Sequence, residues 1–152
     1  MVLWAIRRIG GFRPPPLHAH DVVGRRVDEV IRYFGTYGMG SPGFFALGLE
    51  HDWLVVSLWG AADWLRLEGR LLSEIVEDEL TSFLVGRTIT ALNVDRASMN
   101  IGFGNGTTLI IDDDSSTRVP WPGTGKPRAL APDEDLRDGV FLCPTEELWT
   151  GD

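Results

Sequence analysis

The sequence predicts a mainly β fold of the α+β class, in which two related three-stranded β units form a sandwich or a partly open barrel with one connecting helix. Three observations predict it: an internal repeat, short alternating apolar segments between glycines and prolines, and one segment of helical periodicity. With 152 residues, of which 43% are hydrophobic, the chain can bury one core, so residues 1–152 are predicted to form a single domain.

The internal repeat is visible in two blocks. Val23-Gly24-Arg25 returns 62 residues later as Val85-Gly86-Arg87, and Leu47-Gly48-Leu49 returns 54 residues later as Ile101-Gly102-Phe103. A loop insertion within the glycine-rich residues 36–43 accounts for the difference of eight residues, because surface loops tolerate insertions. The predicted repeat units, the products of an internal duplication, are residues 22–68 and 84–119.

The first elements are a strand, a stiff connector and an ambiguous segment. Val2, Trp4 and Ile6 alternate and predict a strand over residues 2–9, before the three prolines at 14–16. The apolar residues of 21–34 fit one face of a helix, but the matching residues of the second unit are rich in β-branched types. Because both copies should share one structure, we expect a strand over residues 26–34 and keep the helix as the alternative.

Each unit also carries a predicted hairpin. The second hairpin turns at Gly104-Asn105-Gly106, where an Asn-Gly step is typical of a type I′ turn, and the first turns at His51-Asp52. A further short strand is expected over residues 64–68. The hairpin strands are predicted at residues 44–50, 53–59, 99–103 and 107–112.

One helix is predicted over residues 73–84, between the units. Ser73 can cap its start, early acids complement its dipole, and its apolar residues recur at helical spacing. The rest of the chain is expected to contain a proline-rich loop at 120–132, one helical turn at 133–138, a last strand at 140–143 and a final turn at 145–149 that covers the sheet.

The charge and composition exclude several classes of function. The net charge of −8 argues against nucleic acid, because phosphate binding needs a basic surface. Residues 112–152 hold ten acids against four basic residues, so this third of the chain suits a basic partner. No apolar run reaches the ~20 residues of a membrane helix. An apolar rather than basic start differs from a secretory signal, so we expect a cytoplasmic protein.

The candidate chemical motifs are all incomplete. His18-Ala19-His20-Asp21 is the most metal-like cluster, but a zinc site needs three or four ligands and no partner pair has the required spacing. Asp112-Asp113-Asp114 lacks the EF-hand pattern, and the glycines of 102–106 lack the ending of a phosphate-binding loop. The lone cysteine, Cys143, lies in an apolar context that suits a buried thiol. We therefore predict no catalytic residues and no cofactor, with His18 and His20 as weak metal candidates.

Tryptophans and acids together predict a partner-binding surface. Six tryptophans exceed what a core of this size needs, and Trp is enriched at binding hot spots. On this surface acids would steer a basic partner and exposed tryptophans would anchor it. Its predicted residues are Trp59, Trp64, Trp121, Asp112, Asp113, Asp114, Asp133, Glu134 and Asp135.

Two stretches carry a resemblance to known proteins. Val85-Gly86-Arg87-Thr88-Ile89, and Leu54-Val55-Val56 followed by Trp59-Gly60 and Asp63-Trp64, resemble small actinobacterial proteins, some of which are encoded beside polymorphic toxins as immunity proteins. The resemblance covers the two repeat cores. It implies a bacterial protein with a β-rich fold and no enzymatic activity.

The sequence therefore favours a cytoplasmic, non-enzymatic protein-binding protein with an immunity-type or regulatory role. One alternative is a small-ligand-binding protein that uses a cleft between the two β units. Another is a metal-dependent enzyme that combines His18 and His20 with acids brought near by folding. An exposed strand edge could also pair two chains as a homodimer.

Overall fold

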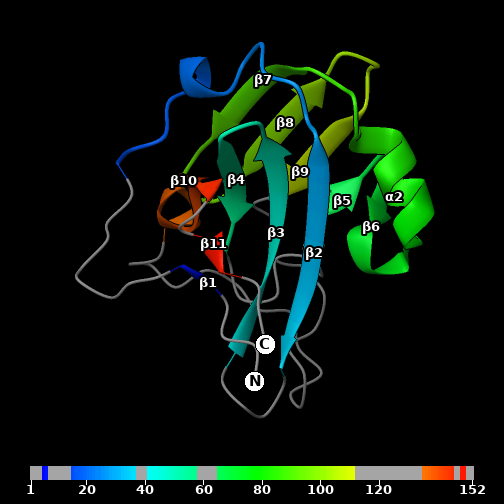
Figure 1. Cartoon of the computed structure of the whole chain (residues 1–152), viewed down its shortest axis with the longest axis horizontal. Helices are drawn as coiled ribbons and strands as arrows, with labels where there is room; N and C mark the ends of the chain where they lie inside the picture. The colour runs from blue at the N-terminus through cyan, green and yellow to red at the C-terminus, as the bar shows by residue number, and fades with distance from the viewer. Residues whose placement is uncertain are drawn as a thin grey trace.

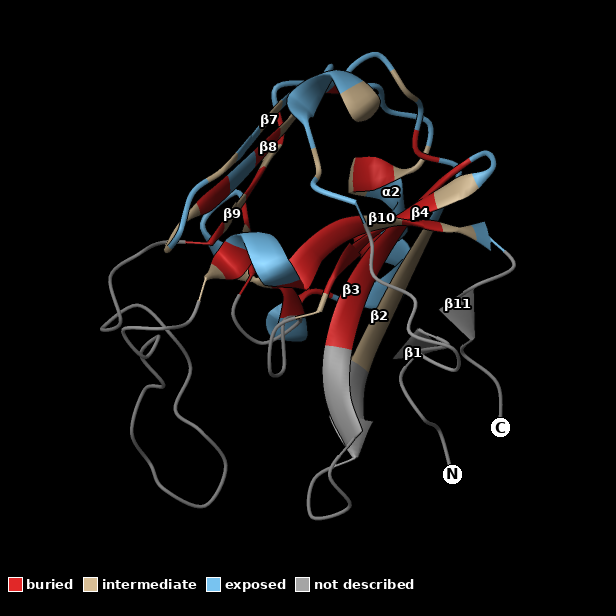
Figure 2. Cartoon of the chain, turned by 90° about the vertical axis from the view of Figure 1, so that its left-hand side faces the viewer, coloured by how far each residue is buried: buried red, intermediate tan, exposed pale blue. Residues whose placement is uncertain are grey.

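The computed structural model describes residues 5–6, 15–36, 41–57, 65–111, 135–145 and 148–149. In these residues the chain forms a four-stranded and a five-stranded antiparallel sheet, a small two-stranded pair and one α-helix (Figure 1). The predicted mainly β fold of the α+β class is confirmed. The two sheets face each other as an open sandwich and do not close into a barrel (Figure 2).

The four-stranded sheet has the order β10-β4-β3-β2. The segment that fitted both helix and strand is strand β2, so the helix alternative is wrong. The hairpin of β3 and β4 turns at Glu50-His51, one residue before the predicted position, because Leu49 pairs with Asp52. The strands are β2 (Glu29–Thr36), β3 (Ser41–Leu49), β4 (Asp52–Val56) and β10 (Val140–Pro144).

The five-stranded sheet has the order β6-β5-β9-β8-β7. The expected hairpin of β8 and β9 is present, but its turn is not type I′. Gly106 has a φ of 86° and Asn105 is not left-handed, while Gly106 N–H donates to Phe103 C=O at 3.0 Å. The strands are β5 (Arg66–Leu67), β6 (Arg70–Leu71), β7 (Ile89–Val94), β8 (Met99–Phe103) and β9 (Thr108–Ile111).

The predicted helix over residues 73–84 is wrong in its first part. A 3₁₀ turn, η2 (Leu72–Glu74), is followed by extended Ile75 and Val76, and the α-helix α2 covers Glu77–Leu84. The guanidinium of Arg32 binds the carbonyls of Leu72 and Ile75, which a continuous helix would use internally. The predicted apolar stripe nevertheless reaches the core.

The chain ends differ from the prediction. Residues 145–149 were expected as a turn, but Leu148–Trp149 forms strand β11, which pairs with β1 (Ala5–Ile6). The first strand, predicted over residues 2–9, is confirmed where it is described. Figure 2 places this pair on the side of the four-stranded sheet away from β7–β9. The expected helical turn is 3₁₀, η4 (Leu136–Gly139), and begins after Asp135. A second 3₁₀ turn, η1 (Ala19–Asp21), precedes β2.

The main core lies between the two sheets. Alternation along each strand sends every second side chain inward. The inward residues of the central strands are almost wholly buried: Phe45, Leu47, Leu49, Leu54 and Val56 from one sheet, and Met99, Ile101, Phe103, Leu109 and Ile111 from the other. A second cluster covers the outer face of the four-stranded sheet and includes Cys143, which is fully buried as expected of a structural thiol.

The two sheets are built alike. The order β10-β4-β3-β2 corresponds to β5-β9-β8-β7. Val30 opposes Leu47 in the first sheet and Leu92 opposes Ile101 in the second, at the repeat offsets of 62 and 54 residues. An internal duplication would produce these matching registers, and the duplication itself stays a prediction.

Each sheet takes one of these strands from the other half of the chain. β5 follows β4 in sequence but pairs with β9, where Arg66 opposes Ile110. β10 follows β9 in sequence but pairs with β4, where Phe141 opposes Val55. The exchanged strands tie the two halves together through main-chain hydrogen bonds.

The two Val-Gly-Arg motifs meet at a local two-fold axis. Four main-chain hydrogen bonds of 2.8 Å join them, from Gly24 to Ile89, from Gly86 to Val27, from Val27 to Arg87 and from Ile89 to Arg25. Exchanging the repeat units turns each bond into another of the set. The axis therefore passes between Arg26 and Thr88, which form an isolated β-bridge.

Candidate binding groove

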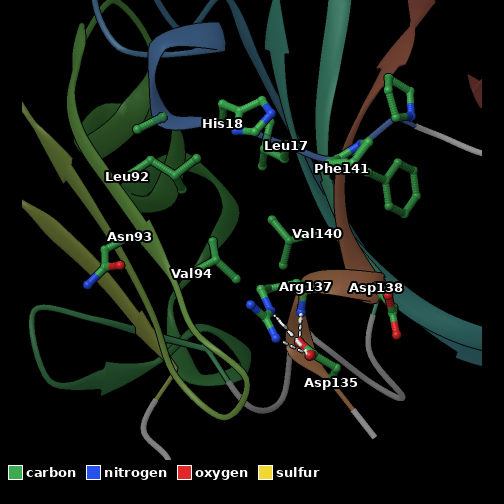
Figure 3. A pocket seen from close by; sticks show the side chains of 13 residues that line it. Leu17, His18, Leu92, Asn93, Val94, Asp135, Arg137, Asp138, Val140 and Phe141 are labelled. Atoms are coloured by element: carbon green, nitrogen blue, oxygen red, sulfur yellow. Dashed lines mark hydrogen bonds and ion pairs between the residues drawn. The ribbon is translucent and has the colours of Figure 1, made fainter.

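A half-open groove of about 690 Å³ lies between the two sheets, beside strands β7 and β10 (Figure 3). It opens where the edge strand of one sheet faces the edge strand of the other. Three separate parts of the chain line it: Pro15, Pro16, Leu17, His18 and Ala19; Leu92, Asn93 and Val94; and Asp135, Arg137, Asp138, Val140 and Phe141.

Apolar side chains form the facing walls of the groove. Leu92 and Val94 of β7 are partly buried against the main core, and Val140 of β10 belongs to that core. Leu17 packs against the same cluster from the segment before η1. Figure 3 shows Leu92 and Val94 opposite Val140 across the groove. A ligand with apolar groups would therefore contact an existing apolar surface.

An ion pair occupies the η4 end of the groove. Arg137 donates through Nε to Asp135 Oδ1 at 2.9 Å and through Nη2 to Oδ2 at 2.6 Å, and the Arg137 backbone N–H also donates to Oδ1. These hydrogen bonds lower the pKa of Asp135 from 3.8 to about 2 and raise the pKa of Arg137. Asp135 is therefore ionised at neutral pH and cannot donate a proton in general-acid catalysis.

The η4 turn is anchored beside this groove. Leu136 is fully buried in the main core, and its N–H donates to Arg96 C=O at 2.8 Å. Asp138 is exposed, lines the groove and makes no ion pair within the described residues. The groove thus carries one fixed ion pair and one carboxylate that is open to a basic group.

Both strands that border the groove present an unpaired edge. Main-chain groups alternate between the two sides of an antiparallel strand. Gly139 C=O accepts from Ser57 N–H on the β4 side, so the main chain of Val140 and Leu142 faces outward. No strand of the described residues pairs with this edge of β10 or with the outer edge of β7. Such edges can accept another extended segment.

The weak metal candidates lie at and near the groove. His18 lines it, and the rings of His18 and His20 stack in parallel with centroids 5.4 Å apart. His20 is 80% exposed and its Nε2 lies 3.3 Å from Asp21 Oδ1. In the part of the chain that the structure describes, no group of three His, Cys, Asp or Glu side chains is arranged to hold a metal ion.

Of the predicted partner-binding residues, Asp135 alone lies in the described residues, and it lines the groove. The other eight fall outside them: Trp59, Trp64, Trp121, Asp112, Asp113, Asp114, Asp133 and Glu134. Sequence reasoning missed the groove walls, because Leu92, Val94 and Val140 carry only the apolar pattern of core residues. Arg137 is signalled only by its place two residues after Asp135.

The described features define a class, a mainly β sandwich of two sheets with an open groove at one edge. No protein-family profile matches the chain, and no curated protein or solved structure matches it significantly. Among the described residues, no helix has both the length and the apolar character needed to cross a bilayer.

Proposed function

We propose that this chain is a non-enzymatic binding protein whose partner is another protein, with a regulatory or immunity-type role in the cytoplasm. One observation carries the proposal: an apolar groove is bordered by two unpaired strand edges, on β7 and β10. Natural proteins usually blunt or cover free edges, because an exposed edge recruits other chains. An edge left open beside an apolar groove suits recognition of a protein segment.

Charge favours a basic partner. The chain carries a net charge of −8, and the exposed Asp138 offers a carboxylate at the groove. Asp133 and Glu134 immediately precede the groove residue Asp135 in the sequence. The proposal therefore keeps the acids and tryptophans named from sequence as the wider surface that steers and anchors the partner.

Affinity capture from the native lysate, followed by mass spectrometry, tests this function. We expect one stoichiometric partner on the wild-type chain, and at least about a tenfold loss of it on Asp138→Arg. Asp78→Arg is the matched control, because Asp78 is also exposed but lies on α2, outside the groove.

Two results would overturn the proposal. One is the absence of any stoichiometric protein partner. The other is a partner that binds equally well to Asp138→Arg, to a triple Asp112, Asp113 and Asp114 neutralisation, and to Ala variants of Trp59, Trp64 and Trp121.

The volume of the groove supports a second candidate function. About 690 Å³ falls within the range of small-molecule sites, and Asn93, Arg137 and Asp138 supply polar groups. Mass spectrometry of the protein purified under native conditions separates the candidates. A retained small molecule that Asp138→Arg releases would favour a ligand, whereas a doubled mass at high concentration would indicate a homodimer.

A further inference from the structure

We propose that β10 accepts an extended segment of the partner as a fifth strand, and that two apolar side chains of this segment, three residues apart, fill the groove. This inference rests on the proposed function and names the partner's chemical class. Its basis lies in the chain itself, because the equivalent edge of the other sheet is already occupied in this way.

The five-stranded sheet differs from its counterpart by the single strand β6. β6 pairs with the outer edge of β5, and Leu72 N–H continues the ladder to Leu65 C=O at 3.0 Å. The strand equivalent to β5 in the other sheet is β10. Through the matching registers on β9 and β4, Arg66 corresponds to Phe141 and Leu65 to Val140.

The residues that follow β6 show what fills such a groove. Leu72 and Ile75 are 0% and 2% exposed, and both lie in the main core. Arg32 of β2 binds the carbonyls of both residues. An extended strand followed by two apolar side chains therefore closes the space between β5 and β2.

The walls of the two sites correspond as well. Val94 of β7 occupies the register position of Arg32 in β2. The segment before η1 corresponds to α2: Val23 N–H donates to Ala19 C=O as Val85 N–H donates to Thr81 C=O, each at 2.9 Å. The open groove thus has the same frame as the filled one, with an apolar wall where the filled one has a guanidinium.

The continuation of the described chain after β10 leads away from this edge. Thr145 N–H donates to His51 C=O, and Leu148–Trp149 then pairs with Ala5–Ile6. Nothing equivalent to β6 follows β10 in the described residues. The site therefore suits a strand supplied by another chain, with a basic residue placed to meet Asp138.

Selection of random displayed peptides on the full-length protein tests this inference. We expect selected peptides to share two apolar residues three apart and a basic residue. Their affinity should fall at least about tenfold on Val94→Asp, which places a charge on the apolar wall. Val76→Asp is the matched control, because Val76 is 65% exposed and lies outside the groove.

A second pair of variants isolates the backbone contact. Leu142→Pro removes an outward N–H from β10 without touching the ladder to β4, and Leu142→Ala removes the same side chain but keeps the N–H. We expect Leu142→Pro to bind the peptides at least about tenfold more weakly than Leu142→Ala at equal thermal stability.

The outcomes separate this inference from the proposed function. If no peptides are selected, if they lack the apolar pair, or if both Leu142 variants bind alike, strand addition is wrong. The captured partner's sensitivity to Asp138→Arg would still support protein binding. If Val76→Asp weakens the peptides as much as Val94→Asp, binding lies elsewhere and the groove assignment is overturned.

Discussion

At the scale of single residues, the repeated glycines explain why the Val-Gly-Arg motif occurs twice. Gly24 and Gly86 have φ values of 90° and 85°, which side chains rarely adopt. This conformation directs each glycine N–H to the opposite half of the chain. The motif therefore encodes the junction between the two sheets.

Replacing either glycine should destabilise the fold by a similar amount. No atom lies within 4 Å of a Cβ built at Gly24, so the cost of Gly24→Ala is the strained backbone, about 1–2 kcal/mol. Gly86→Ala should cost about the same, as measured by chemical denaturation. Gly104→Ala is the control, because Gly104 has no positive φ. Equal unfolding free energies for all three variants would contradict this role of the motif.

Arg32 holds the segment between β6 and α2. Its side chain is 8% exposed and binds two carbonyls and Glu77. Arg32→Met keeps the apolar stem but leaves the Leu72 and Ile75 carbonyls without this donor, which should cost about 1–3 kcal/mol of unfolding free energy. The exposed Arg87 supplies the control, Arg87→Met, and equal stability of the two variants in urea would sink this prediction.

The ion pair at the groove makes a pH-dependent contribution. Arg137 lowers the pKa of Asp135 from 3.8 to about 2, so the folded state binds this proton less tightly than the unfolded state. The contribution is therefore full above pH 4 and is lost as the pH falls towards 2. An NMR titration of the Asp135 carboxyl should show the low pKa, which Arg137→Gln should raise. A midpoint near 4 in the wild-type protein would refute the geometry.

At the scale of elements, sequence patterns identified most of the described strands, because alternation and turn residues act locally. The segment of β2 was decided by its match to the second unit, not by its own periodicity. The helix break at Ile75 and Val76 escaped prediction, because a distant arginine binds the carbonyls there. The short strands β6 and β11 also escaped it, because two residues carry no periodicity.

The register of β10 makes a sharp prediction about proline. Leu142 N–H faces the open edge, whereas Phe141 N–H faces β4 and belongs to its ladder. Leu142→Pro should therefore fold with a moderate loss of thermal stability, close to that of Leu142→Ala. Phe141→Pro should lose far more than Phe141→Ala. Circular dichroism melts measure both pairs, and equal proline penalties at the two sites would show that the register is wrong.

At the scale of the whole molecule, the exchange of β5 and β10 decides how the halves depend on each other. β10 is separated in sequence from the sheet that it completes, yet it carries Val140 into the shared core. Buried area and main-chain hydrogen bonds are both lost if this strand is removed. The sheets are therefore expected to fold together and not in turn.

A chain cut between residues 111 and 135 tests this dependence. Neither fragment should fold alone, and mixing them should restore the spectrum of the intact chain, because the C-terminal fragment supplies η4 and β10. Leu136→Asp in that fragment should abolish recovery, since Leu136 is fully buried, and Asp138→Asn should not. A stably folded N-terminal fragment would contradict the account.

Less of the candidate site than of the fold could be predicted. Its walls come from residues 15–19, 92–94 and 135–141, which only the tertiary structure brings together. Asp135 was found because acids cluster in its part of the sequence. The unpaired edges were invisible, because sequence patterns indicate strands but not which of them lie at an edge.

The central claim is that the outer edge of β10 receives a strand from a partner protein. Hydrogen exchange at the Leu142 amide, measured with and without the captured partner, tests it most directly. We expect fast exchange in the free protein and strong protection in the complex, with the Phe141 amide protected in both states. Protection of Leu142 in the free protein, or exchange that the partner leaves unchanged, would contradict the claim.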